Sequence, residues 1–533
     1  MISDINIHVN QDLCYACGIC VDRCIMDNLR LAVPPCQQAC PLRMNCMGYV
    51  RLIALGKERE AVEEMRKYSP FGGILGRLCS HPCETECERV KVDGAVNIRV
   101  LKRYLADAYP EIAYRVPEIV KETGKQAAVI GSGPAGLMAA FELLSYGHGV
   151  TVFEADSNPG GMLQKCIPAY RLPVSEVERA VKMLEEMGTI FKTNTALGRD
   201  ISFDQLETEY GVVILAIGTG APLDLNIPGH DLPGVMQGLD LLKKAKVGDP
   251  PALGNSVVVI GGGNTAMDAA LICRKLEIPD VKIVCLEGED EMPAYDPEIL
   301  QTRKAGVVVE NCWGPTQLIK DSHGSIQIEF SRCLSVFDDQ GSFNPTLEPV
   351  CGLNLSVDSV ILAVGLQIEA RGIAENLFDP HSRLLAADPV TKQSATKPNV
   401  FVCGDCQSGP ASVVEAMASG KEAALSADRY LSGIALRWGR DFWSDGNIKE
   451  YESDLARAKG GPREEANRLD LQEGGLTLET EMGLTAEKAK IEAERCLSCG
   501  RSIEINKTCW FCLPCEIDCP VQALEVRMPY QVR

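Results

Sequence analysis

Histidine, basic charge and long apolar runs are scarce in this 533-residue chain, and each shortage excludes a class of protein. The six His are scattered, so no Ser/His/Asp constellation or histidine metal site is suggested. No apolar run reaches the ~18 residues needed to span a bilayer, and the N-terminus lacks the basic and apolar segments of a signal peptide. A formal net charge of −20 argues against nucleic acid as a partner. We therefore expect a cytoplasmic protein without a membrane span.

Cysteine, in contrast, is abundant, and 16 of the 24 cysteines lie within residues 14–87 and 496–519. A cytoplasmic chain of this size needs no disulfide framework, so the clusters indicate metal and redox chemistry. The candidate ligands are Cys14, Cys17, Cys20, Cys24, Cys36, Cys40, Cys46, Cys79, Cys83, Cys87, Cys496, Cys499, Cys509, Cys512, Cys515 and Cys519.

The two ends of the chain repeat one another. The spacing C-x2-C-x2-C-x3-C occurs at 14–24 and again at 509–519, each time between two short strand-like segments. Each copy is half of a two-cluster bacterial-type ferredoxin, in which the fourth cysteine ligates the other cluster. Joined ends would pair Cys519 with the N-terminal cysteines and Cys24 with the C-terminal ones. The alternative, in which each end keeps its own four cysteines, stays equally open.

A complete dinucleotide-binding fingerprint begins at the buried-strand run 127–130. It continues through Gly131-Ser132-Gly133-Pro134-Ala135-Gly136, a helical stretch to Tyr146, and a strand that ends in Glu154. In this motif the first glycine allows the tight turn, the second lets the backbone approach a pyrophosphate, and the third lets helix pack on strand. The acidic residue accepts the ribose hydroxyls. We predict a first dinucleotide site here.

A second copy follows strand 257–260 at Gly261-Gly262-Gly263-Asn264-Thr265-Ala266, and Glu287 stands at its acidic position. A carboxylate there binds a free 2′-hydroxyl and repels a 2′-phosphate, which favours NAD(H) over NADP(H). The alternative is that Glu287 caps a strand while Arg274 or another base reaches the phosphate. Farther on, a strand ends in Gly404-Asp405, and a helix begins near Ser412 and Val413, where its N-terminus would stabilise a reduced flavin.

These motifs together resemble the glutamate synthase small subunit family, whose relatives include the flavin subunit of electron-bifurcating transhydrogenases and the N-terminal half of dihydropyrimidine dehydrogenase. The resemblance covers about 36–433 and includes Cys36-x3-Cys40-Pro41, Gly160-Gly161-Met162-Leu163 and Glu291-Met292-Pro293-Ala294. It implies FAD in the first fold, a nicotinamide cofactor in the second, and two four-iron clusters in a helical N-terminal domain. Further candidate cofactor contacts are Gly161, Arg171, Gly218, Gly365, Gly404, Asp405, Ser412 and Val413.

Three departures from the family pattern stand out. Leu286-Glu287 replaces two Arg, which weakens NADPH binding. Lys102 occupies a position where the family often has an amide or carboxylate ligand, and an ammonium cannot ligate iron. The family's Arg-Cys-Leu-x-Cys segment, missing before Cys36, is found at 495–499. We therefore expect the C-terminal arm to fold back onto the helical domain.

The expected ligands form four cysteine sets, consistent with about four 4Fe-4S clusters. Two sets belong to the helical domain and two to the joined ends. They are set 1 (Cys40, Cys46, Cys79 and Cys83), set 2 (Cys36, Cys87, Cys496 and Cys499), set 3 (Cys14, Cys17, Cys20 and Cys519) and set 4 (Cys24, Cys509, Cys512 and Cys515).

The expected fold is α/β, with one Rossmann-like domain inserted in another, because strands, glycine-rich turns and helices alternate from Lys125 to about Gly433. The predicted domains are a ferredoxin-like half module (1–35), a helical iron-sulfur domain (36–120), an FAD-binding domain (121–225 and 352–435), an NAD(P)-binding domain (226–351), a connecting arm (436–490) and a C-terminal ferredoxin-like module (491–533).

The predicted function is that of an oxidoreductase subunit that moves electrons between NAD(H) and a partner subunit or a ferredoxin. Hydride transfer between two stacked cofactor rings needs no catalytic side chain, so none is predicted. Three alternatives stay open: a glutamate synthase small subunit proper, an electron-bifurcating module, and a non-catalytic electron-transfer scaffold.

Overall fold

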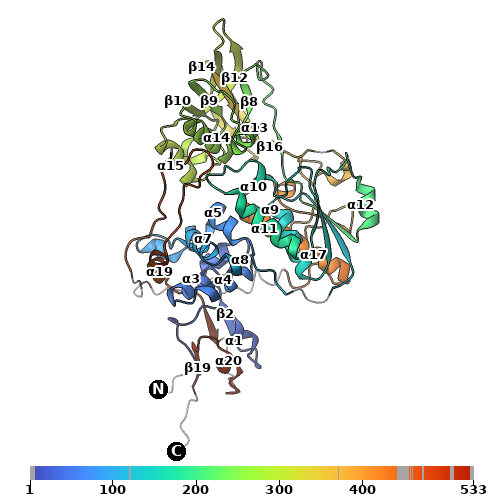
Figure 1. Ribbon diagram of the computed structural model, residues 1–533, viewed down its shortest axis with the longest axis vertical. Coiled ribbons are helices and arrows are strands. Elements are labelled where there is room, and N and C mark those ends of the chain that lie inside the picture. Colours follow the sequence, from blue (N-terminus) through green and yellow to red (C-terminus); the bar gives the residue numbers. More distant parts are fainter. Residues whose placement is uncertain are drawn as a thin grey trace, which may run out of the picture.

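The computed structural model describes residues 6–118, 122–369, 371–440, 455, 458, 460–470, 473–504 and 509–527. The molecule is elongated, with a nucleotide-binding domain at one end and the module built from both chain ends at the other (Figure 1). A helical domain and a second nucleotide-binding domain lie between them. None of the helices in the described residues is long and apolar enough to cross a membrane.

The predicted FAD-binding domain is built on a five-stranded parallel sheet with the order β17-β6-β3-β4-β5. Its strands are short apolar runs that helices cover, and all four residues of β6 are fully buried, as in a parallel sheet covered on both faces. Its elements are β3 (Gln126–Ile130), α9 (Pro134–Ser145), β4 (Gly149–Phe153), α10 (Met162–Lys165), α11 (Val174–Glu186), β5 (Ile190–Lys192), α12 (Phe203–Glu209), β6 (Val212–Leu215), β17 (Val400–Val402), α16 (Asp405–Ser408) and α17 (Val413–Ser432).

The second nucleotide-binding domain is inserted between β7 (Ala221–Pro222) and β16 (Leu366–Gln367), which pair antiparallel at its base. A five-stranded parallel sheet, β11-β10-β9-β15-β8, carries an antiparallel sheet, β12-β13-β14, at its side. The elements are β8 (Val235–Gln237), α13 (Gly238–Lys246), β9 (Ser256–Ile260), α14 (Asn264–Lys275), β10 (Asp280–Val284), α15 (Asp296–Lys304), β11 (Val308–Glu310), β12 (Trp313–Lys320), β13 (Ile326–Phe337), β14 (Phe343–Val357) and β15 (Ser359–Leu362).

One predicted domain boundary is wrong. The sequence pattern predicts that the inserted domain ends at residue 351 and that 352–435 belongs to the FAD-binding domain. In the structure β15 lies between β8 and β9, with Ile361 paired to both Met236 and Val259. The buried run 359–362 therefore completes the core of the inserted domain, and the chain returns only at β16. Both domains use the same kind of apolar strand, so the pattern could not tell which sheet this one would join.

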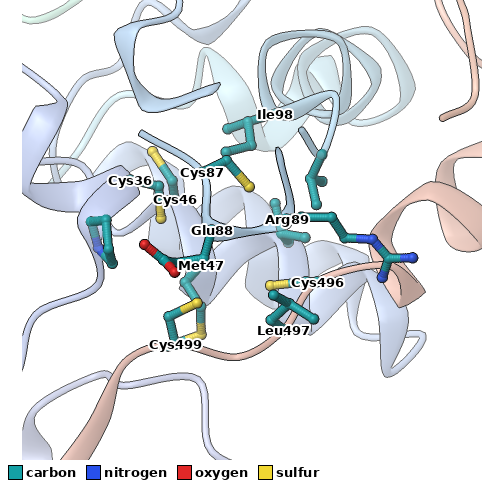
Figure 2. A pocket seen from close by; sticks show the side chains of 13 residues that line it. Cys36, Cys46, Met47, Cys87, Glu88, Arg89, Ile98, Cys496, Leu497 and Cys499 are labelled. Atoms are coloured by element: carbon teal, nitrogen blue, oxygen red, sulfur yellow. The ribbon is translucent and has the colours of Figure 1, made fainter. Parts of the chain in front are cut away.

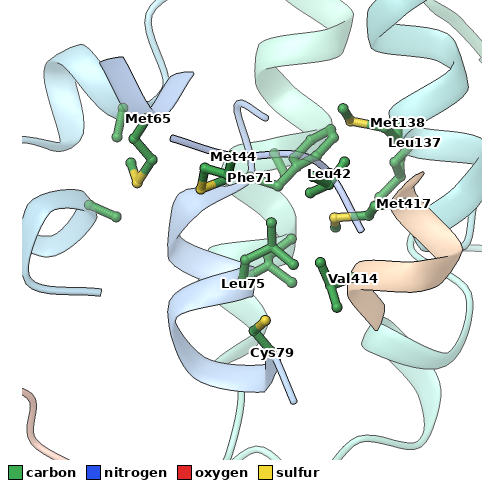
Figure 3. Packing of buried hydrophobic residues seen from close by; sticks show 14 of the residues in the cluster. Leu42, Met44, Met65, Phe71, Leu75, Cys79, Leu137, Met138, Val414 and Met417 are labelled. Carbon is green, nitrogen blue, oxygen red and sulfur yellow. The ribbon is translucent and has the colours of Figure 1, made fainter. Parts of the chain in front are cut away.

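The helical domain packs directly against the FAD-binding domain. Phe71 and Leu75 share one apolar core with Met138 of α9 and Met417 of α17 (Figure 3). A helix from the C-terminal arm, α19 (Ala486–Glu494), also packs on this domain, against α3 and α7. The elements are α2 (Pro35–Ala39), α3 (Cys46–Ala54), α4 (Glu58–Arg66), α5 (Gly72–Leu78), α6 (Pro82–Thr85), α7 (Ile98–Ala108) and α8 (Pro110–Ala113).

The two ends of the chain form one module. Strand β1 (Ile7–Val9) pairs antiparallel with β19 (Leu524–Val526), and β2 (Leu29–Ala32) pairs with β18 (Arg501–Glu504). Two short helices, α1 (Ile19–Asp22) and α20 (Pro514–Ile517), pack together beside these strands. The expectation that the termini meet is confirmed, since each pair joins one strand from each end.

Candidate functional site

A cleft of about 1260 Å³ runs between the two nucleotide-binding domains. It is larger than the roughly 300–1000 Å³ that holds one ligand, which suits two dinucleotides. All the predicted cofactor contacts line it except Gly136 and Ala266. Those two residues are buried in α9 and α14 instead, where they contribute to helix packing.

The first glycine-rich turn has the shape of a phosphate cradle. Gly131 has a φ of +97°, and a Cβ there would lie 2.4 Å from the carbonyl oxygen of Ala216. A Cβ at Gly136 would lie 2.0 Å from the carbonyl oxygen of Gly131, so helix and strand approach as closely as the motif requires. A Cβ at Gly133, in contrast, would meet no atom within 4 Å. The residues present therefore fit a pyrophosphate at the start of α9.

Glu154 is held at the end of β4 by its neighbours. Its carboxylate accepts hydrogen bonds from the backbone N–H groups of Ser132 (3.1 Å) and Asp156 (2.9 Å). The side chain is buried but borders the cleft. This is the place that an acceptor for ribose hydroxyls needs.

The far wall of this site is the start of α17. Burial raises the pKa of Asp405 to about 6. Ser412 caps α17 in a reciprocal capping box with Glu415, and Pro410, Ala411 and Ser412 all line the cleft. The partial positive charge of the helix N-terminus therefore faces the cleft, where it favours an anionic ring.

The second glycine-rich turn repeats the geometry of the first. Gly261 has a φ of +133°, and a Cβ there would lie 2.2 Å from the carbonyl oxygen of Ala363. Gly263 has open space around it. The carboxylate of Glu287 lies next to Gly262: a Cβ added to Gly262 would be 2.6 Å from the carboxylate oxygen. Burial raises the pKa of Glu287. A carboxylate thus stands at the ribose position of this second cradle.

Arg171 has a role beyond the one predicted for it. It lines the cleft, but its guanidinium forms ion pairs with Asp268 (2.7 Å) and Glu298 (2.6 Å), both in the inserted domain. The two nucleotide-binding domains are therefore linked by a partly buried ion-pair network. Nothing in the motif at 167–172 indicated these partners, which lie about a hundred residues farther along the chain.

Set 2 lines a single cavity in the helical domain (Figure 2). Cys496 and Cys499 come from the C-terminal arm, and Cys36 and Cys87 from the N-terminal part of the chain. Met47, Val50 and Ile98 make the rest of the lining largely apolar. Cys46 of set 1 also lines this cavity, and the other four thiols, those of set 2, fit the ligand chemistry of a four-iron cluster.

Set 1 gathers around the buried residue Lys102. Burial alone would lower the pKa of Lys102, but the combined effect of the cysteines of set 1 is larger and raises this pKa. Hydrogen bonds with Cys36 and Cys40 hold the pKa of the Cys46 thiol well above its ordinary range. Cys46 thus lies between sets 1 and 2. A cation among four thiols fits a site that carries negative charge, as a thiolate-bound cluster does.

The terminal cysteines gather in the crossed arrangement. Burial, and then Cys14, Cys17 and Cys519, raise the pKa of Cys20 to about 11. Burial, and then Cys24, Cys509 and Cys512, raise the pKa of Cys515 to about 11. Among the residues that the structure describes, no group of His, Cys, Asp or Glu could hold a single metal ion.

The C-terminal arm ties three domains together, a role that the sequence did not reveal. Lys275 of the inserted domain donates to the carbonyl of Gly475 (3.0 Å), and Thr480 donates from its backbone N–H to the carbonyl of Tyr170 (3.0 Å). In the helical domain Arg77 pairs with Glu479 (2.8 Å). The residues in these contacts are 200 to 402 positions apart in the sequence, so no local sequence pattern could predict the contacts.

Comparison with known proteins identifies the family of the nucleotide-binding half of the chain. A family model described as pyridine nucleotide-disulphide oxidoreductase matches residues 125–420, more than half of the chain. The chain belongs to this oxidoreductase family. A second model, described as dihydropyrimidine dehydrogenase domain II with a 4Fe-4S cluster, matches residues 13–113. The resemblance predicted from the motifs is confirmed.

The oxidoreductase is similar to subunits of larger enzymes. It is 32% identical over 500 residues to NADP(+)-dependent formate dehydrogenase subunit beta of Moorella thermoacetica, covering 88% of this chain and 70% of the relative. It is 30% identical over 535 residues to NADPH-Fe(3+) oxidoreductase subunit beta of Geobacter sulfurreducens, covering 93% and 79%. NAD-dependent dihydropyrimidine dehydrogenase subunit PreT of Escherichia coli is 29% identical over 403 residues, covering 75% and 91%.

A solved structure shares the fold of the nucleotide-binding half. FprA from Mycobacterium tuberculosis in complex with NADPH aligns with a TM-score of 0.50 at 21% identity, covering 58% of this chain and 85% of FprA. At that identity the likeness shows the fold alone. The predicted α/β class with two Rossmann-like domains is confirmed.

Proposed function

We propose that the oxidoreductase passes electrons from NADH to a partner subunit or a ferredoxin through FAD and four 4Fe-4S clusters. FAD, when bound, exchanges electron pairs with a nicotinamide and single electrons with clusters, and the clusters carry single electrons. The one cleft, lined by both glycine-rich turns, would hold the two dinucleotides, and the sixteen cysteines would supply the thiolates. Three relatives of this chain carry names of subunits, which supports a partner.

The observation that carries the proposal is that the four cysteine sets lie in series from the cleft to the joined ends. Cys79 of set 1 follows Leu78, which lines the cleft and ends α5, a helix in contact with α17. Cys79 and Val414 of α17 belong to one apolar core (Figure 3). Cys46 connects set 1 to set 2, because it also lines the cavity that the cysteines of set 2 line (Figure 2). Asn45, next to Cys46, donates to the carbonyl of Tyr15 (3.1 Å), which lies between two cysteines of set 3.

The two terminal sets continue this series. Set 3 lies against the helical domain, where Arg51 donates to the carbonyl of Asp12 (2.6 Å). Helices α1 and α20 pack together; of set 4, Cys24 follows α1, Cys509 and Cys512 precede α20, and Cys515 lies within α20. The step from set 2 to set 3 runs from Cys499 to Ser502, whose hydroxyl lies 2.7 Å from the thiol of Cys20, so each step of the proposed relay joins elements that are in contact. We assign the ligands as sets 1 to 4, because the crossed cysteine neighbours disfavour the alternative in which each end keeps its own four cysteines.

Glu287 supports NADH as the electron donor, although relatives with NADP and with NAD in their names both exist. We expect the wild-type protein, assayed with a one-electron dye, to have a higher kcat/KM for NADH than for NADPH. In Glu287→Ser the ratio of the two kcat/KM values should fall by about tenfold or more, because a repelling charge worth at least ~1.4 kcal/mol is removed.

Glu289→Ser is the matched control, since this exposed carboxylate two residues away forms its ion pair with Arg303. It should leave the ratio unchanged. A wild-type preference for NADPH would contradict the role of Glu287. No dye reduction with either nucleotide would instead indicate the non-catalytic scaffold.

A further inference from the structure

Three large apolar side chains next to cysteines of set 4 in the sequence are exposed to solvent. Ile25 is 71% exposed, Trp510 72% and Ile517 74%, which places them among the most exposed large apolar residues of the described chain. Ile25 directly follows Cys24, Trp510 directly follows Cys509, and Ile517 lies two positions after Cys515. Cys24, Cys509 and Cys515 pack in one cluster, so the exposed residues next to them in the sequence lie at one site. Exposed large apolar groups at one site mark a contact surface, whereas isolated ones are ordinary.

The two terminal sets differ in how they meet solvent. In set 3, Cys14 and Cys20 are buried, Cys17 and Cys519 are half-buried, and the set packs against the helical domain. In set 4, Cys515 is buried and Cys24 and Cys509 are half-buried, but Cys512 is exposed. Set 4 is therefore the set that the protein leaves open to another molecule.

We propose that Ile25, Trp510 and Ile517 form an exit surface. A partner redox protein docks on it and takes single electrons from the cluster that set 4 would hold. This inference rests on the proposed function. The module of joined ends, which carries set 4, lies at the end of the molecule farthest from the inserted domain (Figure 1), so an acceptor docked there adds the next step of the series. Tryptophan is one of the residue types that dominate binding energy in interfaces, and Trp510 is exposed here.

The occupant is a protein with its own one-electron cofactor beneath an apolar contact area and a basic rim. The chain carries a net charge of −20, which steers basic partners. Ile517 also follows the carboxylate Glu516, whereas Asp518 on its other side already pairs with Arg23 (2.9 Å). The balance of the reaction is fixed: one NADH gives NAD⁺, one proton and two electrons, and each of two partner molecules is reduced by one electron.

The test uses the full-length protein loaded with FAD and iron-sulfur clusters, under anaerobic conditions, with the lysine-rich haem protein cytochrome c as acceptor probe. We expect Trp510→Gln to lower kcat/KM for cytochrome c by at least about tenfold, and Ile517→Gln to lower it several-fold. Ferricyanide reduction and the cluster EPR signals should stay at wild-type values, because a small dye needs no docking surface. If Trp510→Gln disturbs the neighbouring Cys509 and changes the cluster EPR signals, Ile517→Gln replaces it as the test variant.

Trp438→Gln is the matched control, because Trp438 is equally exposed (74%) but lies beyond the end of α17. It should leave cytochrome c reduction unchanged. The exit surface is overturned if Trp510→Gln and Ile517→Gln, with intact EPR signals, reduce cytochrome c at the wild-type rate. It is also overturned if the wild type reduces ferricyanide but not cytochrome c.

Two further outcomes distinguish a docking surface for a redox partner from a dimer interface and from an inactive protein. If both variants convert a dimer into a monomer with unchanged electron delivery, the surface joins two copies of the chain and the proposal is overturned. If the wild type reduces neither ferricyanide nor cytochrome c with NADH or NADPH, the proposed function itself fails, and the exit surface with it.

Discussion

Deletion of residues 491–533 should lower the iron content from about sixteen to about four atoms per FAD. The deleted segment carries six of the sixteen candidate ligands. Sets 2, 3 and 4 each lose at least one thiolate, and only set 1, around Lys102, keeps all four. FAD content should stay near one per chain, because none of the residues that line the nucleotide cleft lies in the deleted segment.

Iron and FAD analysis of the anaerobically purified protein checks this expectation. If each end instead held its own cluster, the N-terminal one would survive and about eight iron atoms would remain. The triple variant Cys509→Ser, Cys512→Ser, Cys515→Ser is the matched control, since it removes set 4 alone and should cost about four iron atoms. Eight or more iron atoms in the deletion variant would contradict the joining of the two ends.

Arg495→Met should destabilise the helical domain by about 3–5 kcal/mol. Arg495 and Glu492 are both fully buried and paired at 2.7 Å. The guanidinium also pairs with Asp93 (2.9 Å) and donates to the carbonyl of Gly94 (2.9 Å). Glu492 would be left buried without its cation, although it also accepts from the backbone N–H of Asn97. Because Cys496 directly follows Arg495, the substitution should also weaken the packing of the segment that supplies Cys496 and Cys499 to set 2.

Urea unfolding followed by the visible absorbance of the clusters measures this effect, with Arg468→Met as the control. Arg468 lies on the same arm, but its side chain is 54% exposed and its ion pair with Glu481 is near the surface. An exposed pair contributes only about 0–1 kcal/mol. Equal destabilisation by the two variants would show that the buried pair does not hold the arm in place.

Much of the site could be predicted from the sequence because glycine-rich turns and cysteine spacings are local patterns. Gly131 and Gly261 have positive φ values, which glycine adopts without strain, so the residue type alone predicts the tight turns. The structure leaves open space beside Gly133 and Gly263, as the motif predicts. The repeated cysteine spacing, with a strand on each side, likewise predicts that the ends meet, as they do in the pairing of β1 with β19.

The remaining features depend on contacts between distant segments. The pairs of Arg77 with Glu479 and of Arg171 with Asp268 join charged residues whose sequence neighbours carry no sign of the partner. The placement of β15 in the inserted domain depends on which of two similar apolar sheets had room for it. The chemistry of Lys102 excludes it as an iron ligand, but its burial among the thiols of set 1 is visible only in three dimensions.

The most direct test of the proposed electron relay is an anaerobic titration of the FAD- and cluster-loaded protein with NADH, followed by absorbance and EPR spectroscopy together. The series of sites from the cleft to the joined ends predicts that flavin absorbance bleaches and that EPR signals of reduced four-iron clusters grow with the added NADH. Flavin bleaching without any cluster signal, at any amount of NADH or NADPH, would contradict it.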